Sequence, residues 1–472
     1  MRNVSVIGSG PAGCVFAYAL MNKGYNITLY SDRTPDEWLN HSAPTGTAYL
    51  YGSTIDIERE LGMDHWSQDM FEGHGVLLDF VPKVGMKPMT ATGMFEQGRA
   101  GCGIDQRMRV SRWLEDFEGR GGKLVIETVS AQRLDEISLN ADLTVLAAGK
   151  GDLNKAIARD PSRSHYEKPQ RKLAMTFARS KSGRHVKEWF NGRANGMNAV
   201  KFDFFADEGE CFWVPYYHKD EGHIYCLLWE AKEGRRMDKF DGAKSSLDIL
   251  NAGKSVIRDI CPWEHDIVDD MEAIDDPYGW VAGQFSPTVR MPFGKMPSGG
   301  KVIPVGDTAV LFDPIGGQGG NHASKHAKWL ADRVIAHGDK DFDDAWMIAV
   351  NHDWWNEYAK YAYAFNNTLL EPVTVAGKTL LMEVARNEKF ASDHFFGGFP
   401  DPKSFFPYFE DFKAARKIVG DYRSTPKDRL RHKLPVWTAA LKVEIAAKSL
   451  FAKNNYPSPG YTTSVMDNEK RA

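Results

Sequence analysis

The sequence predicts an α/β protein in three parts: a domain built on a parallel sheet, an inserted antiparallel sheet, and a helical C-terminal region. The chain begins with an apolar strand, a glycine-rich turn and an amphipathic helix. Four strand-like runs separated by turn residues follow between residues 172 and 230, and helical patterning dominates from residue 322 onward. At 472 residues the chain is long enough for two or three domains.

The first element is a nucleotide-binding cradle at residues 3–24, NVSVIGSGPAGCVFAYALMNKG. A side chain at Gly8 would block the tight turn, one at Gly10 would push the backbone off a pyrophosphate, and one at Gly13 would hold the helix away from the strand. The helix that begins at Pro11 and Ala12 would turn free N–H groups and its positive dipole end toward the anion. This motif predicts a site for FAD or NAD(P).

The second predicted strand, residues 26–30, ends differently from most strands at this position. An acidic residue usually stands there and binds the adenosine ribose. Here Ser31 takes that place, followed by Asp32 and Arg33, and either of the last two side chains could reach the ribose or its phosphate. The alternative is that Asp32 only starts a turn before Pro35.

A second motif far along the chain, KVIPVGDTAVLFDPIGGQGGNHAS at 301–324, selects FAD over NAD. A strand that ends in Gly306 and Asp307 can place a carboxylate on the ribityl hydroxyls of a flavin, although an Asp after a strand can also cap a helix. The glycine-rich turn that follows would set its N–H groups against the isoalloxazine edge, or serve packing alone. The candidate residues of this turn are Pro314, Gly316, Gly317, Gly319, Gly320 and Asn321.

The strand VLAAG at 145–149 adds Ala148 and Gly149 to the candidate cofactor-binding residues. Together with this strand, the motifs resemble the flavoprotein monooxygenases of the para-hydroxybenzoate hydroxylase type. The chain is most similar to the oxygenase component of the two-component styrene and indole monooxygenases. The phrases that carry this resemblance are YSDRTPDE at 30–37, RGGK at 120–123, EKPQR at 167–171 and DPIGGQGGN at 313–321. The resemblance spans residues 3–400, is patchy between 180 and 285, and implies a FAD-binding domain of the glutathione-reductase type.

One departure from the single-component hydroxylases concerns the nicotinamide cofactor. Those enzymes carry an Asp-Gly pair after this strand, which serves both FAD and the visiting NADPH, whereas this chain has Gly149-Lys150-Gly151-Asp152. The difference predicts that the chain does not bind NAD(P)H productively. The resemblance then implies a partner, an NAD(P)H-dependent flavin reductase that supplies reduced FAD.

The resemblance also implies the reaction. Reduced flavin takes up O₂ to form a C4a-hydroperoxide, whose distal oxygen is transferred to an apolar alkene or an electron-rich aromatic, and epoxidation demands no acid or base. Backbone N–H groups near Pro314, Gly316 and Gly317 are expected to stabilise the peroxide. Thr47 and Ala48 lie where the related enzymes carry small polar residues beside the flavin ring, and Ala48 replaces an expected asparagine.

The remaining candidates are side chains on predicted helices and strands. Arg107, at the start of a predicted helix over 107–118, is a candidate cofactor-binding residue. Phe204, Trp213 and Tyr217 belong to the inserted sheet and line either an apolar pocket or the core, and Asn366-Asn367-Thr368 is equally ambiguous. His218, His322 and His326 have no carboxylate or thiol grouping near them in the sequence, so we expect surface or helix roles and no metal site.

The predicted domains are discontinuous. Residues 1–75, 100–165 and 285–345 form the FAD-binding domain, and residues 76–99 and 166–284 form the substrate domain, with a hairpin in 76–99. Residues 346–472 form the helical C-terminal region with a disordered tail from 457. Residues 34–47 are expected to be a connection, and a helix is expected over 55–61.

Composition excludes several classes. A net charge of −4 and a pI of about 6.4 argue against nucleic acid, and five cysteines without CxxC spacing indicate reduced thiols in the cytoplasm. No run of 18 apolar residues is present, so we expect no membrane insertion, and because the chain starts directly with a strand we expect no signal peptide. The sequence leaves a homodimer open.

Rival functions share much of this pattern. They are a self-contained FAD/NAD(P)H aromatic hydroxylase, a flavin-dependent C=C reductase, a flavin-binding partner without catalysis, and a halogenase. The segment CFWVP at 211–215 is a poor match to the Trp-x-Trp-x-Ile-Pro segment of halogenases. Fold alone does not choose among these reactions.

Overall fold

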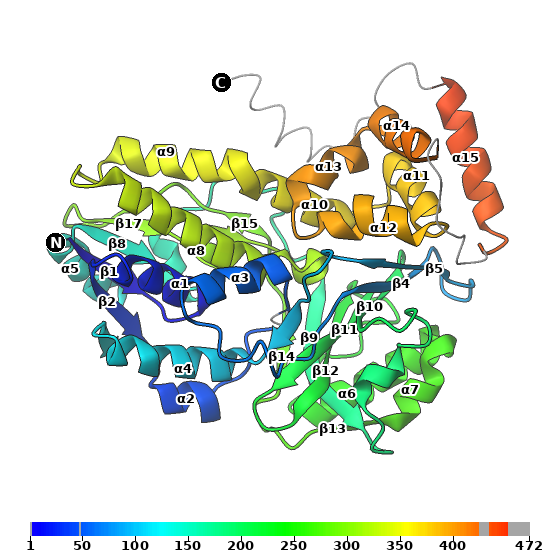
Figure 1. The fold of residues 1–472 in the computed structure, drawn as a ribbon, viewed down its shortest axis with the longest axis horizontal. Coiled ribbons are helices and arrows are strands. Elements are labelled where there is room, and N and C mark those ends of the chain that lie inside the picture. Colours follow the sequence, from blue (N-terminus) through cyan, green and yellow to red (C-terminus); the bar gives the residue numbers. More distant parts are fainter. Residues whose placement is uncertain (1, 47–48, 424–433, 452–472) are drawn as a thin grey trace.

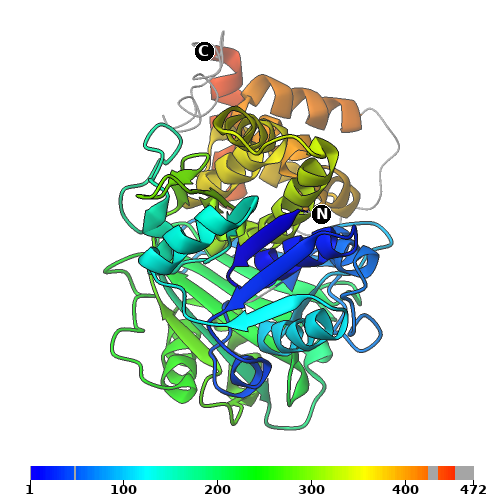
Figure 2. The ribbon, with the colours of Figure 1, turned by 90° about the vertical axis from the view of Figure 1, so that its left-hand side faces the viewer.

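The computed structural model describes residues 2–46, 49–423 and 434–451, and it contains two large sheets with helices around them (Figure 1). In Figure 1 the sheet that holds the N-terminus lies on the left and the second sheet lies at the lower right. The orange C-terminal helices lie above the second sheet, and Figure 2 shows the same order from the side.

The first sheet is the expected parallel one. Its strand order is β16-β17-β8-β1-β2-β7, with only β16 antiparallel to its neighbour. The strands are β1 (Asn3–Ile7), β2 (Asn26–Ser31), β7 (Lys123–Ile126), β8 (Leu143–Leu146), β16 (Gly294–Lys295) and β17 (Lys301–Pro304). The central strand β8 is buried along its whole length, as expected for a parallel strand that is covered on both faces.

Helices cover both faces of this sheet. The helices α1 (Pro11–Met21), α4 (Gln106–Gly119), α8 (Gln318–His337) and α9 (Asp344–Trp354) share one apolar core with β1 and β2. On the other face, α5 (Ala131–Asn140) packs against Ile7 and Leu146. α4 and α3 (Gly52–Glu60) confirm the two helices expected near 107–118 and 55–61.

The expected connection at 34–47 was wrong in one respect, because it contains the helix α2 (Pro35–Asn40). Thr34 caps it by accepting the N–H of Glu37, and the Glu37 carboxylate accepts the N–H of Thr34 in return, so the two form a capping box. Pro35 occupies the first helical position, where its missing N–H costs nothing.

The second sheet has ten strands, and its main path runs β13-β9-β12-β11-β10-β4-β5. The four expected strands are β9 (Lys172–Ser180), β10 (Ala199–Phe205), β11 (Gly209–His218) and β12 (Gly222–Ala231). The expected hairpin is β4 (Gly75–Val81) and β5 (Met89–Met94). The other members are β3 (Tyr49–Leu50), β6 (Cys102–Ile104), β13 (Met271–Ala273) and β14 (Trp280–Gly283).

The sheet is mostly, not wholly, antiparallel. β10 pairs with β4, and β11 pairs with β6, in parallel. Neither pair is joined by a hairpin, because β4 and β6 come from an earlier stretch of the chain than β10 and β11, so nothing local dictates an antiparallel arrangement.

The two faces of the second sheet carry different helices. On one face lie α6 (Ser246–Ile260) and α7 (His265–Asp270). The other face packs against the helical C-terminal region, which includes a π-helical turn at Trp355–Ala359. Its helices are α10 (Lys360–Leu370), α11 (Val375–Val384), α12 (Glu388–His394), α13 (Pro402–Glu410), α14 (Phe412–Arg423) and α15 (Thr438–Phe451).

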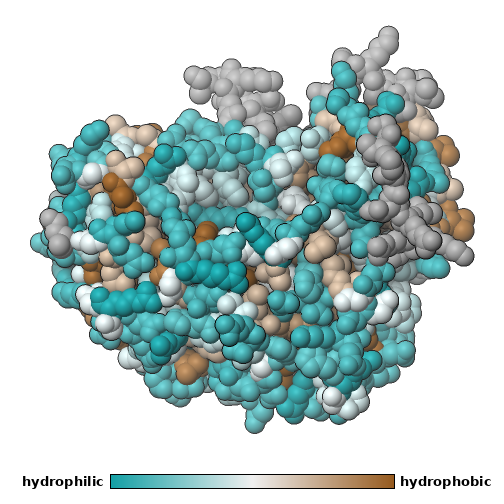
Figure 3. Space-filling model, in the orientation of Figure 1, coloured by the Kyte–Doolittle hydropathy of each residue, from teal (hydrophilic) through white to brown (hydrophobic). Residues whose placement is uncertain are grey.

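The surface shown in Figure 3 is mainly hydrophilic, with small and scattered apolar patches. Within the described residues, no helix combines the length and the hydropathy that a membrane span requires. The predicted tail from 457 lies outside the described residues.

Candidate active site

Four strands of the first sheet end at one edge, and each is followed by a loop that the sequence marked as a candidate. Ile7 pairs with Tyr30 on one side and with Leu146 on the other, and Leu146 pairs in turn with Pro304. Because these strands are parallel, the loops at 8–13, 31–34, 147–151 and 305–308 begin side by side. This carboxyl edge is the candidate cofactor site.

The three glycines of the cradle have different roles in the structure. A Cβ on Gly8, whose φ is +107°, would lie 2.3 Å from the Ala147 oxygen, and one on Gly13 would lie 1.9 Å from the Gly8 oxygen. A Cβ on Gly10 would meet nothing within 4 Å. Gly8 and Gly13 therefore serve the packing of strand and helix, whereas Gly10 faces open space.

Gly10 is also the N-cap of α1, and no side chain caps this helix. Pro11 occupies its first position and Ala12 is almost fully buried. The N–H groups of an uncapped first turn have no partner within the helix, and the helix dipole adds positive potential there. This end of α1 can bind an anion.

At the end of β2 the three candidate side chains separate into two groups. Ser31 is fully buried and donates to the Arg33 carbonyl at 2.6 Å, and its hydroxyl lies 2.7 Å from that of Ser9. Asp32 and Arg33 remain partly exposed and form an ion pair at 3.3 Å. Ser31 thus shapes the strand end, and the predicted ribose contact now depends on Asp32 and Arg33.

Asp307 lies in a short 3₁₀ turn after β17, and its carboxylate has no hydrogen-bond partner among the described residues. It caps no helix there, which removes the alternative left open by the sequence. Burial raises the pKa of Asp307 above its usual value, and the positive charge of Lys150 partly opposes this rise. An acceptor in such a position can receive hydrogen bonds from ribityl hydroxyls.

The loop that carries Asp307 is held by two helices. Gly306, with φ +62°, donates its N–H to His326 Nδ1 on α8 at 3.2 Å, and a Cβ there would lie 2.8 Å from Ala12 on α1. His326 and His322 are both buried, and His322 accepts from Trp354 Nε1 at 2.9 Å. Of the expected surface or helix roles, the helix alternative holds, since both histidines lie on α8 and pack inside; His326 positions the Gly306 turn.

The loop after β8 forms the neighbouring wall. Gly149 has φ +59°, its carbonyl accepts a hydrogen bond from Asn154, and the Ala148 carbonyl accepts the N–H of Gly151 at 3.0 Å. These bonds stabilise a tight turn that begins right after the strand. The turn presents Lys150 at the carboxyl edge.

The glycine-rich turn before α8 differs from the expectation in one respect. Its N–H groups are already engaged: Ile315 donates to Asp313 at 3.2 Å, Gly316 to Asn366 Oδ1 at 3.1 Å, and Gly317 to the Pro314 carbonyl at 2.9 Å. Pro314 has no N–H. The predicted donors within 314–317 are therefore unavailable, and only the first turn of α8, which no side chain caps, can offer N–H groups to a ligand.

Gly319 and Gly320 lie in that first turn. A Cβ on Gly319 would lie 3.8 Å from Asp307 Oδ1, so the helix end is close to the unpartnered carboxylate. The side chain of Asn321 is fully used: it accepts from the Tyr51 N–H at 2.9 Å and donates to the carbonyls of Tyr49 and Gly317, both at 2.9 Å. Asn321 ties α8 to β3 and has no side-chain group left for a cofactor.

An acid pair that the sequence did not predict lies next to the glycine-rich turn. Glu230 on β12 and Asp313 are both buried and lie close enough to influence one another, and neither Glu230 oxygen has a hydrogen-bond partner among the described residues. Burial, and then the charges of Asp313 and Glu210, raise the pKa of Glu230 well above its usual range. Nearby Glu210 is bound by Arg171 through Nε at 2.7 Å and through a second nitrogen at 3.1 Å.

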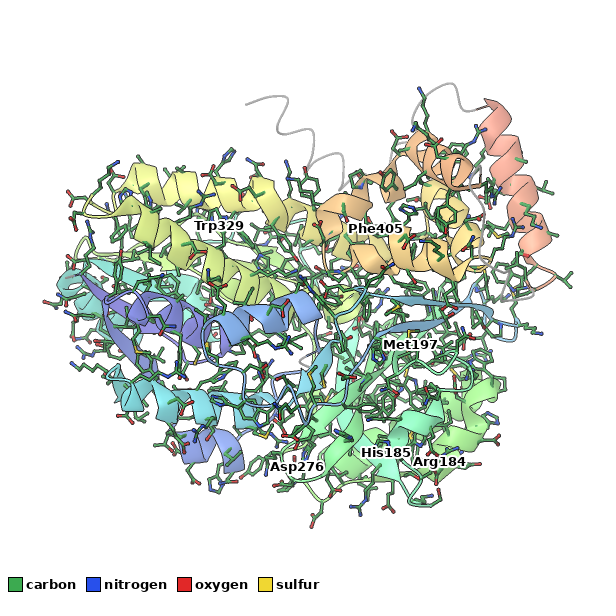
Figure 4. The ribbon with its side chains drawn as sticks, viewed as in Figure 1. Arg184, His185, Met197, Asp276, Trp329 and Phe405 are labelled. Carbon is green, nitrogen blue, oxygen red and sulfur yellow. The ribbon has the colours of Figure 1, made fainter. Side chains whose placement is uncertain are left out.

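Arg107 is fully buried, and its guanidinium is engaged with protein carboxylates. It binds Asp105 at 2.7 Å and Asp276 at 2.7 Å. The His218 Nδ1 accepts the N–H groups of Asp220 and Glu221, so Nε2 carries the proton and donates to Asp276 at 3.1 Å. Figure 4 labels Asp276 near the bottom of the view, at the lower end of the second sheet.

This cluster changes two sequence-based interpretations. Burial works to raise the pKa of Asp276, but the His218 hydrogen bond and the Arg107 charge outweigh it and hold the pKa below its usual range. His218 therefore does have carboxylates around it, contrary to the expectation. Arg107 has no donor directed to the nucleotide in this structure, and its place is a buried ion-pair cluster between α4 and the second sheet.

A narrow apolar cavity of about 40 Å³ lies between the second sheet and the C-terminal helices. Phe202 and Phe204 line it from β10, and Phe399 lines it from the helical side. Gln318 Nε2 donates to the carbonyls of both Phe399 and Gly316, at 3.0 and 2.9 Å, and so connects this cavity to the glycine-rich turn. Trp213 and Tyr217 belong to the apolar cluster on the opposite face of the sheet, where the Trp213 ring contacts Trp189 and Phe190, which confirms core packing for Trp213.

A second carboxylate cluster is already neutralised by basic residues. The buried Asp79, Asp203 and Glu264 have the mutual spacing of a metal site. The Lys201 ammonium lies 2.6 Å from Asp203 and 2.9 Å from Asp79, and Arg193 binds Asp79 and Glu264. The cluster is an internal ion-pair network. The candidates Thr47 and Ala48 lie outside the described residues.

The family model "Styrene monooxygenase A putative substrate binding domain" matches residues 149–266, which contain β9 to β12. Styrene monooxygenase StyA of Pseudomonas sp is 27% identical over 354 residues, or 72% of this chain and 79% of that protein. The chain is a homologue of styrene monooxygenase StyA. This agrees with the family resemblance of the motifs.

Two further similarities extend the StyA relationship. Kynurenine 3-monooxygenase of Saccharomyces cerevisiae is 25% identical over 362 residues, 72% of this StyA homologue and 75% of the yeast protein. The solved structure of the flavin-dependent brominase Bmp2 has a TM-score of 0.58 and covers 90% of this chain and 99% of its own, at 14% identity, which shows a shared fold alone. The StyA homologue is thus similar to flavoprotein monooxygenases in sequence and to flavin-dependent enzymes in fold.

Proposed function

We propose that the chain is the oxygenase component of a two-component FAD-dependent monooxygenase. It would receive reduced FAD from a separate NAD(P)H-dependent flavin reductase. With O₂ it would epoxidise an alkene or oxygenate an electron-rich aromatic of the styrene or indole type. The similarity to StyA over 72% of the chain is the observation that carries this proposal.

The residues at the carboxyl edge fit FAD. The uncapped N-terminus of α1 lies beside open space at Gly10, which suits the pyrophosphate. The Asp307 carboxylate lacks a partner among the described residues and suits the ribityl hydroxyls. The first turn of α8 would hold the polar edge of the flavin ring through its N–H groups.

Bound reduced flavin would activate O₂ and supply one oxygen atom to the substrate. The chain would contribute mainly orientation and the exclusion of water, which needs no acid or base at the reacting carbon. The apolar cavity lined by Phe202, Phe204 and Phe399 supports an apolar substrate next to the glycine-rich turn. Because the cavity has only about 40 Å³, the substrate would have to displace aromatic side chains on entry.

Gly149 and Lys150 support the need for a separate reductase. They stand where single-component hydroxylases of this fold carry the Asp-Gly pair that serves NADPH. No carboxylate follows β8 before Asp152, whose side chain points into solvent and pairs with Lys155.

The test mixes the purified chain with chemically reduced FAD, ¹⁸O₂, and a panel of styrenes, indole and longer alkenes. We expect an epoxide or an indigo-forming product that contains one labelled oxygen atom. Hydrogen peroxide as the sole product across the panel would contradict the proposal. A saturated product formed without oxygen would instead support a C=C reductase, and NAD(P)H consumption by the chain alone would support a self-contained hydroxylase.

A further inference from the structure

Lys150 is an exposed cation at the carboxyl edge that forms no ion pair with the described residues. It follows β8 by four residues, and the left-handed conformation of Gly149 turns the chain just before it. Its ammonium lies 4.1 Å from the centroid of the Phe285 ring. A cation–π contact of this kind orients a lysine without neutralising its charge.

Two carboxylates lie within electrostatic reach of Lys150, the fully buried Asp313 and the half-buried Asp307. The lysine charge acts on Asp307 and on Asp313, but it contacts neither closely enough for an ion pair. Asp313 accepts the Ile315 N–H, whereas Asp307 has no hydrogen-bond or ion-pair partner in the described part of the chain. Asp307 and Lys150, neither of which has an ion-pair partner among the described residues, therefore lie on two adjacent loops of one site.

The other basic side chains predicted for this site are already committed. Arg33 pairs with Asp32 at the predicted ribose end of the site, and Arg107 is surrounded by Asp105 and Asp276. FAD brings two phosphate charges, and its reduced form adds a negative charge on the ring system. A site that already contains the half-buried Asp307 carboxylate favours a nearby cation when it accepts such a ligand, since like charges in a partly desolvated site repel one another.

We infer that Lys150 is a cofactor-binding residue that contacts an anionic group of the flavin dinucleotide. This inference rests on the proposed FAD site. Two groups of the cofactor share the required chemistry, the diphosphate and the reduced ring. The position of Lys150 beside Asp307, the predicted ribityl ligand, favours the ring end, whereas the α1 N-terminus already serves the diphosphate. Lys150 then favours reduced over oxidised FAD.

The test compares Lys150→Met, Lys150→Arg and a matched control, Lys155→Met. Lys155 lies five residues away in the chain, is 82% exposed and, among the described residues, forms one ion pair, with Asp152. Equilibrium dissociation constants are measured anaerobically for oxidised FAD, for dithionite-reduced FAD and for riboflavin. Thermal unfolding without ligand checks that each variant folds, which the exposure of both lysines favours.

We expect Lys150→Met to weaken the binding of reduced FAD at least 10-fold and that of oxidised FAD less than 2-fold. We expect Lys150→Arg to retain most of the wild-type affinity. The midpoint potential of bound FAD should then fall by about 20 mV or more, since the two losses differ at least fivefold and a tenfold difference corresponds to about 30 mV for two electrons. An equal loss for both redox states, with riboflavin binding unchanged, would also support the inference and identify the diphosphate as the group bound.

Three results would overturn it. Lys150→Met could bind both forms of FAD like the wild type, Lys155→Met could cause the same loss, or the arginine variant could fail to restore binding. Absence of FAD binding by the wild-type chain would overturn the proposed function itself, and the inference with it. Normal wild-type binding with an unaffected Lys150→Met variant would overturn the inference alone.

Discussion

The cradle glycines allow a prediction in which one substitution damages the fold and another damages only the site. Gly13 lies in the first turn of α1, where alanine would normally stabilise a helix by about 1 kcal/mol relative to glycine. A Cβ at this position would lie 1.9 Å from the Gly8 oxygen, and real Cβ contacts stay above 3.0 Å, so helix and strand must separate by at least 1.1 Å (3.0 − 1.9). The contacting atom is backbone and cannot rotate away.

We therefore expect Gly13→Ala to lower the free energy of unfolding by about 1–3 kcal/mol, the usual range for overpacking. That corresponds to a fall in Tm of about 2–4 °C per kcal/mol for a domain of this size. Gly10→Ala should change stability by no more than about 1 kcal/mol, since its Cβ meets nothing within 4 Å and its φ of −64° suits any residue. The same substitution should nevertheless weaken FAD binding at least 10-fold, or by about 1.4 kcal/mol.

Thermal unfolding followed by circular dichroism measures the first effect, and FAD titration of the folded variants measures the second. The reasoning fails if Gly13→Ala is as stable as the wild type, because the close approach of α1 to β1 would then not be what the glycine permits. It also fails if Gly10→Ala binds FAD normally, because the open space at Gly10 would then not be where the pyrophosphate lies.

Four further outcomes are expected. Asp307→Asn should weaken FAD binding by about 1–3 kcal/mol in a titration, because the ribityl hydroxyls lose a charged acceptor. The ligand-free variant should be at least as stable as the wild type, because a desolvated charge is removed. A lower Tm of the ligand-free variant would speak against this. Glu230→Gln should show a growing Tm advantage over the wild type from pH 5 to pH 8. The reason is that a raised native pKa makes the native state bind more protons than the unfolded one, so wild-type stability falls with pH by up to about 1.4 kcal/mol per unit; a constant Tm difference across that range would disprove the raised pKa of Glu230. Gly253→Ala should destabilise by about 1–3 kcal/mol, since its Cβ would lie 2.1 Å from the Trp229 ring, and an unchanged denaturation midpoint would contradict the packing of α6. The isolated chain should not consume NADH or NADPH in a spectrophotometric assay, and steady consumption would point to a self-contained hydroxylase.

Most of the candidate cofactor site could be predicted because its motifs are local. Within residues 3–24, the strand–turn–helix motif itself explains why glycine is needed at each of the three positions. The structure shows Gly8 and Gly13 at the close approaches that the spacing indicated. The helix α2 could also have been predicted, since Thr34 and Glu37 form the capping-box pattern after which Pro35 starts the helix.

Other features depended on partners that are distant in sequence. Arg107 was predicted to bind the cofactor, but Asp276, 169 residues later in the chain, engages it in the interior together with Asp105. The Gly316 N–H was predicted to face the flavin, but Asn366 accepts it. No spacing rule predicts which of many polar side chains reaches a given donor once the two sheets and the C-terminal helices have packed.

The sequence by itself determined the parallel sheet, the positions of the glycine cradle and the Asp307 loop, and the relationship to the styrene monooxygenases. These follow from hydrophobic periodicity and from backbone conformations that only particular residues adopt, both of which act within a few residues. The tertiary structure decided which polar groups stay available: it engaged Ser31, Arg107, Asn321 and the N–H groups of the 314–317 turn, and left Asp307 and Lys150 without hydrogen-bond or ion-pair partners among the described residues. The physical reason is that a buried polar group must find a partner wherever the fold places one, so its availability depends on the whole packed molecule.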